Sequence, residues 1–208
     1  MNQSRRKFIK LSGAMGTGIA FSSLTGLALN SCGGQKIDKF GLGLYTLRDD
    51  LPKDPKAVLT EVAAAGYKQI ESYEGPLGIF WGMGHTGFKK LMDDLGMTIV
   101  ASHADINKDF ETKAAQAAEI GMKYLLSPWL GPQKTLDDYK KAAETFNQKA
   151  EICKKNGIRF GYHNHDYTFI PLEGQMPQDI LMSNTDPSLV DFELDIYWIV
   201  TAGQDPEA

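Results

Sequence analysis

The chain has 208 residues, of which 26 are acidic and 22 are basic, so its formal net charge is −4. An acidic balance repels phosphate backbones, which argues against a nucleic-acid-binding protein. From Lys39 onward no long linker or low-complexity segment interrupts the chain, and this predicts one continuous domain over residues 39–208.

The first residues are typical of an export leader. Residues 4–10 read SRRKFIK, and the pair Arg5 and Arg6 followed by Phe8 and Ile9 matches the twin-arginine signal of bacteria. Residues 11–31 are only mildly apolar and contain no run of the roughly 18 to 20 apolar residues that a spanning helix needs. The leader predicts export in the folded state, which is an early hint of a metal or cofactor.

A lipid attachment site is predicted where the leader ends. The segment 29–32, LNSC, resembles a lipobox, which predicts a signal peptide over 1–31, a lipidated Cys32 and a short linker over 32–38. The protein would then sit in the periplasm or cell envelope, held at a membrane by its lipid anchor only. In the alternative interpretation, Cys32 is just the last residue of a poorly defined leader.

Cleavage at this site would change both the charge and the cysteine content. It removes four basic residues and no acidic one, which leaves 18 basic against 26 acidic residues and a net charge of −8. Cys153 would remain as a single unlipidated thiol without an internal disulfide partner. Because it lies in an amphipathic helical pattern, we expect it to be a buried small apolar residue.

The rest of the sequence alternates short apolar runs with segments of helical periodicity. Strands are predicted near residues 40–47, 67–73, 98–102, 124–127, 159–163 and 190–197, and helices near 55–65, 86–95, 110–120, 136–155 and 177–182. Each of the first four helices is followed within two residues by a glycine, the residue that closes a helix most readily. This order predicts an α/β fold with a parallel sheet.

The number of these units predicts an incomplete barrel. Six strand–helix units are two fewer than the eight of a (β/α)8 TIM barrel, which usually needs about 250 residues. Near the end, the segment 205–207, DPE, is typical of a helix start. We expect a TIM barrel truncated after about six β/α units, so that the chain is a fragment of a longer product. An open doubly wound sheet is the alternative.

A cluster of polar residues follows the fifth predicted strand. Because side chains alternate along a strand, His163 and His165 share one face, while Phe160, Tyr162 and Asn164 share the other. If the aromatic face packs against helices, both imidazoles point into the barrel axis, where they suit metal binding or proton transfer. Hydrogen-bonded histidines in a polar loop are the alternative.

The sixth predicted strand turns three carboxylates to one face. Asp191, Glu193 and Asp195 would be expensive to bury together without a cation or hydrogen-bond donors. Asp195 is nearest the carboxyl end, level with the histidines of the preceding strand, and is the preferred candidate for a metal ligand. Asp191 and Glu193 are expected deeper in the barrel, in structural roles.

Further candidates lie at the ends of earlier strands. Glu71 and His103 lie where strands meet the loops of the carboxyl face, the usual location of catalytic groups in such barrels. Both could equally make local hydrogen bonds. Trp129 and Trp198 lie near strand ends, and their aromatic faces suit the apolar faces of sugar rings, although loop packing is as common a role.

Four segments together resemble a known family. Residues 41–49, 54–71, 162–169 and 193–206, which read GLGLYTLRD, DPKAVLTEVAAAGYKQIE, YHNHDYTF and ELDIYWIVTAGQDP, are similar to the sugar phosphate isomerase/epimerase family of xylose-isomerase-like TIM barrels. The likeness is strongest to an exported, lipid-anchored branch, some of whose members act on 3-keto-glycosides or inososes.

The resemblance implies one divalent metal ion, bound by a group from each of strands five to eight. Transferred by motif, the ligand of strand six is Asp195, and that of strand five is His163 or His165. The chain departs from many members in having histidine in place of glutamate on strand five, and Trp198 in place of a histidine. Within the closer branch, Thr168 stands where glutamate is common.

These observations predict a metal-dependent sugar isomerase/epimerase-like enzyme, or a keto-glycoside lyase of the same mechanism. It would remove a proton next to the carbonyl of a sugar or keto-sugar, the first step shared by isomerisation, epimerisation and β-elimination. Mn, Mg, Co and Zn are all compatible with it. The predicted catalytic residues are Glu71, His103, His163 and His165, and the predicted substrate-binding residues are Asn164, Trp129 and Trp198. The alternatives are a non-catalytic carbohydrate-binding lipoprotein and an inactive truncated fragment.

Overall fold

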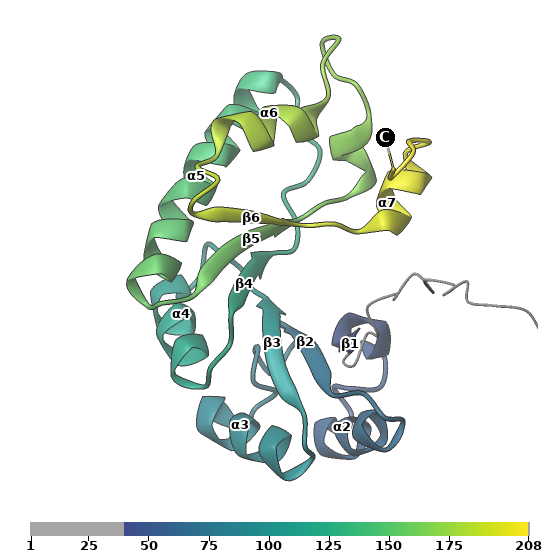
Figure 1. The fold of residues 1–208 in the computed structure, drawn as a ribbon, viewed down its shortest axis with the longest axis vertical. Coiled ribbons are helices and arrows are strands. Elements are labelled where there is room, and N and C mark those ends of the chain that lie inside the picture. Colours follow the sequence, from purple (N-terminus) through teal and green to yellow (C-terminus); the bar gives the residue numbers. More distant parts are fainter. Residues whose placement is uncertain (1–39, 208) are drawn as a thin grey trace, which may run out of the picture. The chain divides into compact units, whose positions relative to one another are not determined.

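The computed structural model describes residues 40–207, which contain one parallel sheet of six strands with an α-helix in each connection (Figure 1). The strands are β1 (Gly41–Gly43), β2 (Gln69–Tyr73), β3 (Thr98–His103), β4 (Tyr124–Ser127), β5 (Arg159–His163) and β6 (Val190–Glu193). The α-helices are α2 (Pro55–Ala64), α3 (Gly84–Asp94), α4 (Phe110–Glu119), α5 (Leu136–Lys155), α6 (Pro177–Asn184) and α7 (Ile196–Thr201), and two short 3-10 helices are η1 (Leu44–Leu47) and η2 (Asp166–Phe169). The predicted signal peptide, Cys32 and the linker lie outside the described residues.

Each strand pairs in parallel with the next strand of the chain, so the spatial order equals the sequence order from β1 to β6. Consecutive parallel strands joined by helices form a TIM barrel. The same order excludes the doubly wound alternative, in which the strand order reverses at a switch point. The predicted TIM-barrel fold is therefore confirmed, with six β/α units in the described part of the chain.

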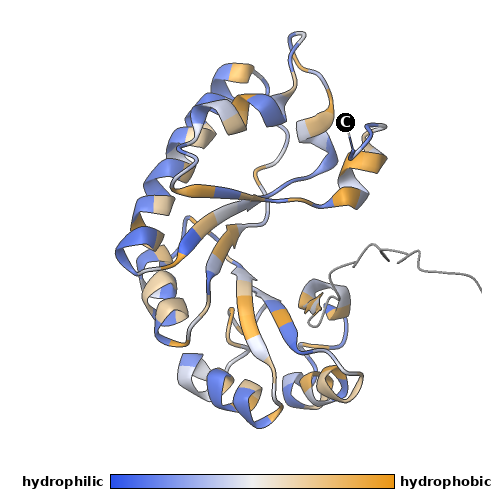
Figure 2. Cartoon of the chain, in the orientation of Figure 1, coloured by the Kyte–Doolittle hydropathy of each residue, from blue (hydrophilic) through white to orange (hydrophobic). Residues whose placement is uncertain are grey.

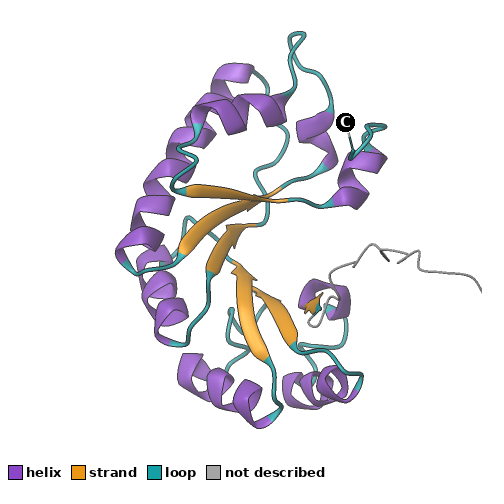
Figure 3. Ribbon diagram, viewed as in Figure 1, coloured by secondary structure: helices purple, strands orange, loops and turns teal. Residues whose placement is uncertain are grey.

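The hydrophobic core lies between the sheet and the helices on its outer side (Figure 3). Phe160 and Tyr162 of β5 are fully buried. Phe146 of α5 stacks on Tyr162 with 5.0 Å between the ring centroids, and Phe110 of α4 meets Phe160 edge-on at 6.1 Å. The predicted orientation of β5 is thus confirmed, and alternation along the strand turns His163 to the opposite, inner face.

Two predicted strands are too long. The strand predicted over 40–47 ends at Gly43 and continues as η1, and the strand predicted over 190–197 ends at Glu193. In the second case Asp195 caps the N-terminus of α7, because its side chain accepts hydrogen bonds from the amides of Tyr197 and Trp198. Residues 205–207 form a turn in which the Asp205 carboxylate accepts a hydrogen bond from the Glu207 amide.

The edge formed by β6 and α7 is rich in hydrophobic residues (Figure 2). Four of them are more than half exposed among the described residues: Leu194, Ile196, Tyr197 and Val200. None of the helices in the described part of the chain is long and apolar enough to cross a membrane. Cys153 is fully buried within α5, as predicted, and burial raises the pKa of its thiol to about 12.

Candidate functional site

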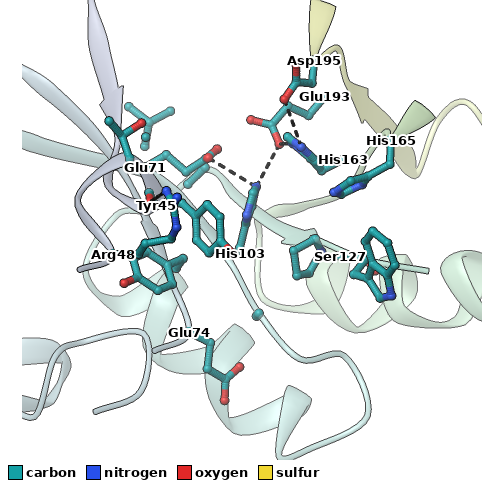
Figure 4. Close-up of a pocket in the computed structure, with 18 of the residues that line it drawn as sticks. Tyr45, Arg48, Glu71, Glu74, His103, Ser127, His163, His165, Glu193 and Asp195 are labelled. Atoms are coloured by element: carbon teal, nitrogen blue, oxygen red, sulfur yellow. Dashed lines mark hydrogen bonds and ion pairs between the residues drawn. The ribbon is translucent and has the colours of Figure 1, made fainter. Parts of the chain in front are cut away.

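Polar side chains gather where the strands end at the carboxyl edge of the sheet (Figure 4). His103, His163 and Glu193 are the last residues of β3, β5 and β6, and Glu71 lies on β2. The last pair of the β5–β6 ladder joins His163 to Glu193, so these two residues start from neighbouring positions. Parallel strands bring their carboxyl ends to one edge, which explains why residues far apart in sequence meet here.

Glu193 is at the centre of this group. Its Oε2 accepts a hydrogen bond from Nδ1 of His163 at 2.7 Å and lies 3.1 Å from Nε2 of His103. The same His103 nitrogen lies 3.3 Å from Oε1 of Glu71. His103, His163 and Glu193 each offer one ligand atom, and these three atoms lie within 4.8 Å of one another, so the group could hold a metal ion.

The two glutamates differ sharply in their acidity. Burial, together with the neighbouring charge of Glu193 and a hydrogen bond to it, raises the pKa of Glu71 to about 9. Burial alone would also raise the pKa of Glu193, but hydrogen bonds from His103 and His163 lower it well below its usual range. At neutral pH the pair therefore holds one proton, carried by Glu71, and one negative charge on Glu193.

Asp195 faces the same group from the start of α7. Its Oδ2 lies 3.4 Å from Nε2 of His163. The imidazole of His163 thus lies between two carboxylates, Glu193 at Nδ1 and Asp195 at Nε2. Asp191 is separate from the site, because its carboxylate pairs with Arg159, whose Nη2 donates to Oδ1 at 3.0 Å.

Glu193 is the site residue that the sequence interpretation missed. It was expected deeper in the barrel because the strand was predicted to run on to Tyr197. The strand ends four residues earlier, at Glu193, so this residue is at the carboxyl edge itself. The strand parity that selected Asp195 also put Glu193 on the same face, and this was the available signal.

An aromatic group surrounds His165 beside the carboxylates. Its ring lies parallel to Tyr167 at 5.6 Å between centroids, 4.7 Å from Trp129 and 5.0 Å from Trp198. Burial, and then the proximity of His163, lowers the pKa of His165, so its imidazole is neutral at neutral pH. The Tyr167 hydroxyl accepts hydrogen bonds from the amides of Leu130 and Gly131 and so holds the loop that carries Trp129.

The site opens into a cavity of about 1580 Å³. This is larger than the roughly 300–1,000 Å³ of ordinary small-molecule sites. The predicted site residues that line it are Glu71, His103, Trp129, His163, His165, Asp195 and Trp198. Asn164 is buried away from it, with its amide bonded to the backbone of Asp195.

Comparisons with known proteins place this geometry in context. No family model matches the sequence, and no curated protein matches it. A solved structure of a sugar phosphate isomerase/epimerase from Parabacteroides distasonis is similar over 81% of this chain and 68% of its own length, with 33% identity and a TM-score of 0.69.

More distant structures share the fold alone. One is a D-psicose 3-epimerase solved in the presence of D-fructose. The match covers 80% of this chain and 66% of the epimerase chain, with 14% identity and a TM-score of 0.58. Another is a xylose isomerase-like TIM barrel protein from Mycobacterium smegmatis in complex with magnesium. The match covers 80% of this chain and 67% of that protein's chain, with 11% identity and a TM-score of 0.57.

Proposed function

Because this chain belongs to the sugar phosphate isomerase/epimerase family, a family of xylose-isomerase-like TIM barrels, we propose that it is a metal-dependent enzyme that removes a proton next to the carbonyl of a sugar or keto-sugar. The observation that carries the proposal is the placement of His163 between two carboxylates at the carboxyl edge of the sheet. TIM-barrel enzymes hold their catalytic groups at this edge.

The donor set at His163 fits a divalent ion. When the neutral ring donates its Nδ1 hydrogen to Glu193, its Nε2 keeps a lone pair that faces Oδ2 of Asp195 at 3.4 Å. Two electron-pair donors at this distance are favourable together when they share a cation. We propose that Nε2 of His163 and Oδ2 of Asp195 are metal ligands, rather than the group of His103, His163 and Glu193, because Oε2 of Glu193 is already hydrogen-bonded to both histidines. Glu193 would orient the histidine, as carboxylates behind metal-bound histidines usually do.

A divalent ion bound there would polarise the carbonyl of the substrate and make the neighbouring carbon–hydrogen bond more acidic. The proton would then move among groups of this chain. Ionised Glu193 would accept that proton, protonated Glu71 would give its own to the carbonyl oxygen, and His103 lies between the two carboxylates. His165 would contribute as a neutral hydrogen-bonding group.

The sugar would lie against the aromatic group around His165. The indole of Trp129 is 59% exposed, and the indole of Trp198 lies on the other flank of the same imidazole. Aromatic faces of this kind suit the apolar faces of sugar rings. We therefore assign Trp129 and Trp198 to substrate binding, beside the proposed metal ligands.

Metal titration of the metal-free protein tests the first part of the proposal. We expect Asp195→Asn and His163→Ala to weaken Mn²⁺ binding by more than about a hundredfold, the upper limit usual for loss of an outer-shell partner, and Glu193→Gln to weaken it about ten- to a hundredfold. Asparagine at 195 can still cap α7, so folding is preserved. Asp191→Asn is the matched control, because this carboxylate lies on β6 but pairs with Arg159 away from the site, and the variant should bind Mn²⁺ like the wild type.

Deuterium exchange tests the reaction. The Mn²⁺-loaded protein is incubated in D2O with a panel of ketoses and keto-sugars, and NMR follows exchange of the hydrogen next to the carbonyl. We expect exchange that Asp195→Asn and Glu71→Gln both abolish. Sugar binding without exchange would favour the non-catalytic carbohydrate-binding alternative, and full Mn²⁺ binding by Asp195→Asn would contradict the metal site.

A further inference from the structure

We propose that Asn164 is a positioning residue, whose side-chain amide holds the backbone of Asp195 so that one oxygen of the Asp195 carboxylate faces His163. This inference rests on the proposed metal site. It assigns Asn164 a role different from direct contact with the substrate.

Asn164 continues the contact between β5 and β6 beyond the point where the backbone ladder ends. The last backbone pair is His163 with Glu193. Further on, the Asn164 amide nitrogen donates to the carbonyl of Asp195 at 3.0 Å, and the Asp195 amide donates to Oδ1 of Asn164 at 2.7 Å. One side chain thus satisfies both backbone polar groups of Asp195, as the backbone of a neighbouring strand would.

The burial of Asn164 separates it from the two histidines beside it. His163 and His165 both line the cavity, whereas Asn164 is 2% exposed and is not part of the lining. Its amide oxygen and nitrogen are both engaged with Asp195. Because side chains alternate along this segment, the two histidines face the cavity, whereas Asn164 faces the backbone of Asp195 behind it.

The two oxygens of the Asp195 carboxylate have separate partners. Oδ1 accepts hydrogen bonds from the amides of Tyr197 at 2.9 Å and Trp198 at 3.4 Å, which caps α7. Oδ2 is left toward Nε2 of His163 at 3.4 Å. Asn164 fixes the backbone of Asp195. Without it that backbone could shift, and the shift would move Oδ2 away from His163.

A double-mutant cycle on Mn²⁺ affinity separates positioning from a general effect on folding. We expect Asn164→Ala to weaken Mn²⁺ binding about ten- to a hundredfold, as loss of an outer-shell partner usually does. Added to Asp195→Asn, the same change should weaken binding no further, because the carboxylate through which Asn164 acts is already gone. Equal effects in both backgrounds, or wild-type affinity in Asn164→Ala, would overturn the inference.

Asn147→Ala is the matched control. Asn147 of α5 makes the same two kinds of hydrogen bond elsewhere, but with two residues, donating to the carbonyl of Asn184 at 3.1 Å and accepting from the amide of Asp186 at 2.8 Å. Its loss should lower stability without changing Mn²⁺ affinity.

Hydrogen exchange provides a readout that does not need the metal. In Asn164→Ala we expect the amides of Asp195 and Tyr197 to lose protection, whereas Asn147→Ala leaves them protected. If the wild type binds no Mn²⁺, the proposed metal site is wrong, and exchange alone decides the positioning role. Unchanged protection of both amides in Asn164→Ala would then reject it.

Discussion

At the scale of single residues, the neighbouring carboxylates of Glu71 and Glu193 differ in their hydrogen-bond partners and in their burial. Glu193 receives hydrogen bonds from two histidines, whereas Glu71 shares only one of them and is more buried. Two neighbouring carboxylates that share a hydrogen bond avoid ionising together. The pair therefore keeps one proton in the metal-free protein. This proton can be detected through the pH dependence of the free energy of unfolding.

We predict that Glu71→Gln flattens the pH dependence of stability in the metal-free protein. The pKa of Glu71 is raised from 4.5 to about 9 in the fold, so between these values the native state holds a proton that the unfolded chain releases. Stability from this group is full below pH 4.5 and is lost as pH rises toward 9, by at most about 1.4 kcal/mol per pH unit. Glutamine mimics the protonated carboxyl and does not titrate.

Urea unfolding at several pH values between 5 and 9, with a chelator present, measures this effect. The wild type should lose stability with rising pH relative to Glu71→Gln, and the two should converge near pH 5. Parallel pH profiles for the two proteins would mean that Glu71 is ionised in the fold.

At the scale of elements, the ends of strands were harder to predict than their existence. All six strands and the helices between them were predicted, because each has a clear apolar period. The strand predicted over 190–197 is longer than β6 because Leu194 and Ile196 continue the alternation of apolar and polar residues beyond Glu193. Asp195 before an apolar run is also the signal of an N-cap, and that local hydrogen bonding determined the outcome.

The loop between β2 and α3 depends on a close approach at Gly75. A Cβ atom at this position would lie 2.4 Å from the ring of Trp81. That indole is almost fully buried and donates a hydrogen bond to the hydroxyl of Ser72 at 3.1 Å. Since Ser72 in turn donates to the carbonyl of Ile79, the three residues form one buried unit.

We predict that Gly75→Ala destabilises the fold by about 1–3 kcal/mol, the usual effect of overpacking, because the indole must leave its hydrogen bond. The control is Gly87→Ala in α3, where a Cβ atom would meet the nearest side-chain atom at an ordinary 3.5 Å. There alanine favours the helix, so stability should be unchanged or higher. Chemical unfolding followed by tryptophan fluorescence measures both, and equal stability of Gly75→Ala and the wild type would contradict the close packing.

At the scale of the molecule, the order of the strands explains what could be predicted about the site and what could not. Strand parity selected His163 and Asp195 as facing groups, and strand ends selected Glu71 and His103. The contact of His103 with Glu193, 90 positions apart, depends on how the whole sheet curves. No local pattern encodes that curvature, so the partners of each candidate residue come only from the fold.

The attachment of the molecule to a membrane is a prediction from the leader, and Cys32 carries it. Acyl chains stabilise membrane binding by about 0.8 kcal/mol per buried CH2, so a lipidated Cys32 should hold the protein in the membrane fraction after export. We predict that Cys32→Ala moves the protein to the soluble fraction and abolishes incorporation of labelled palmitate. Cys153→Ala is the control, because that thiol is buried in α5 and should leave both readouts unchanged. Membrane association that survives Cys32→Ala would reject the lipid anchor, since it would have to come from another part of the protein.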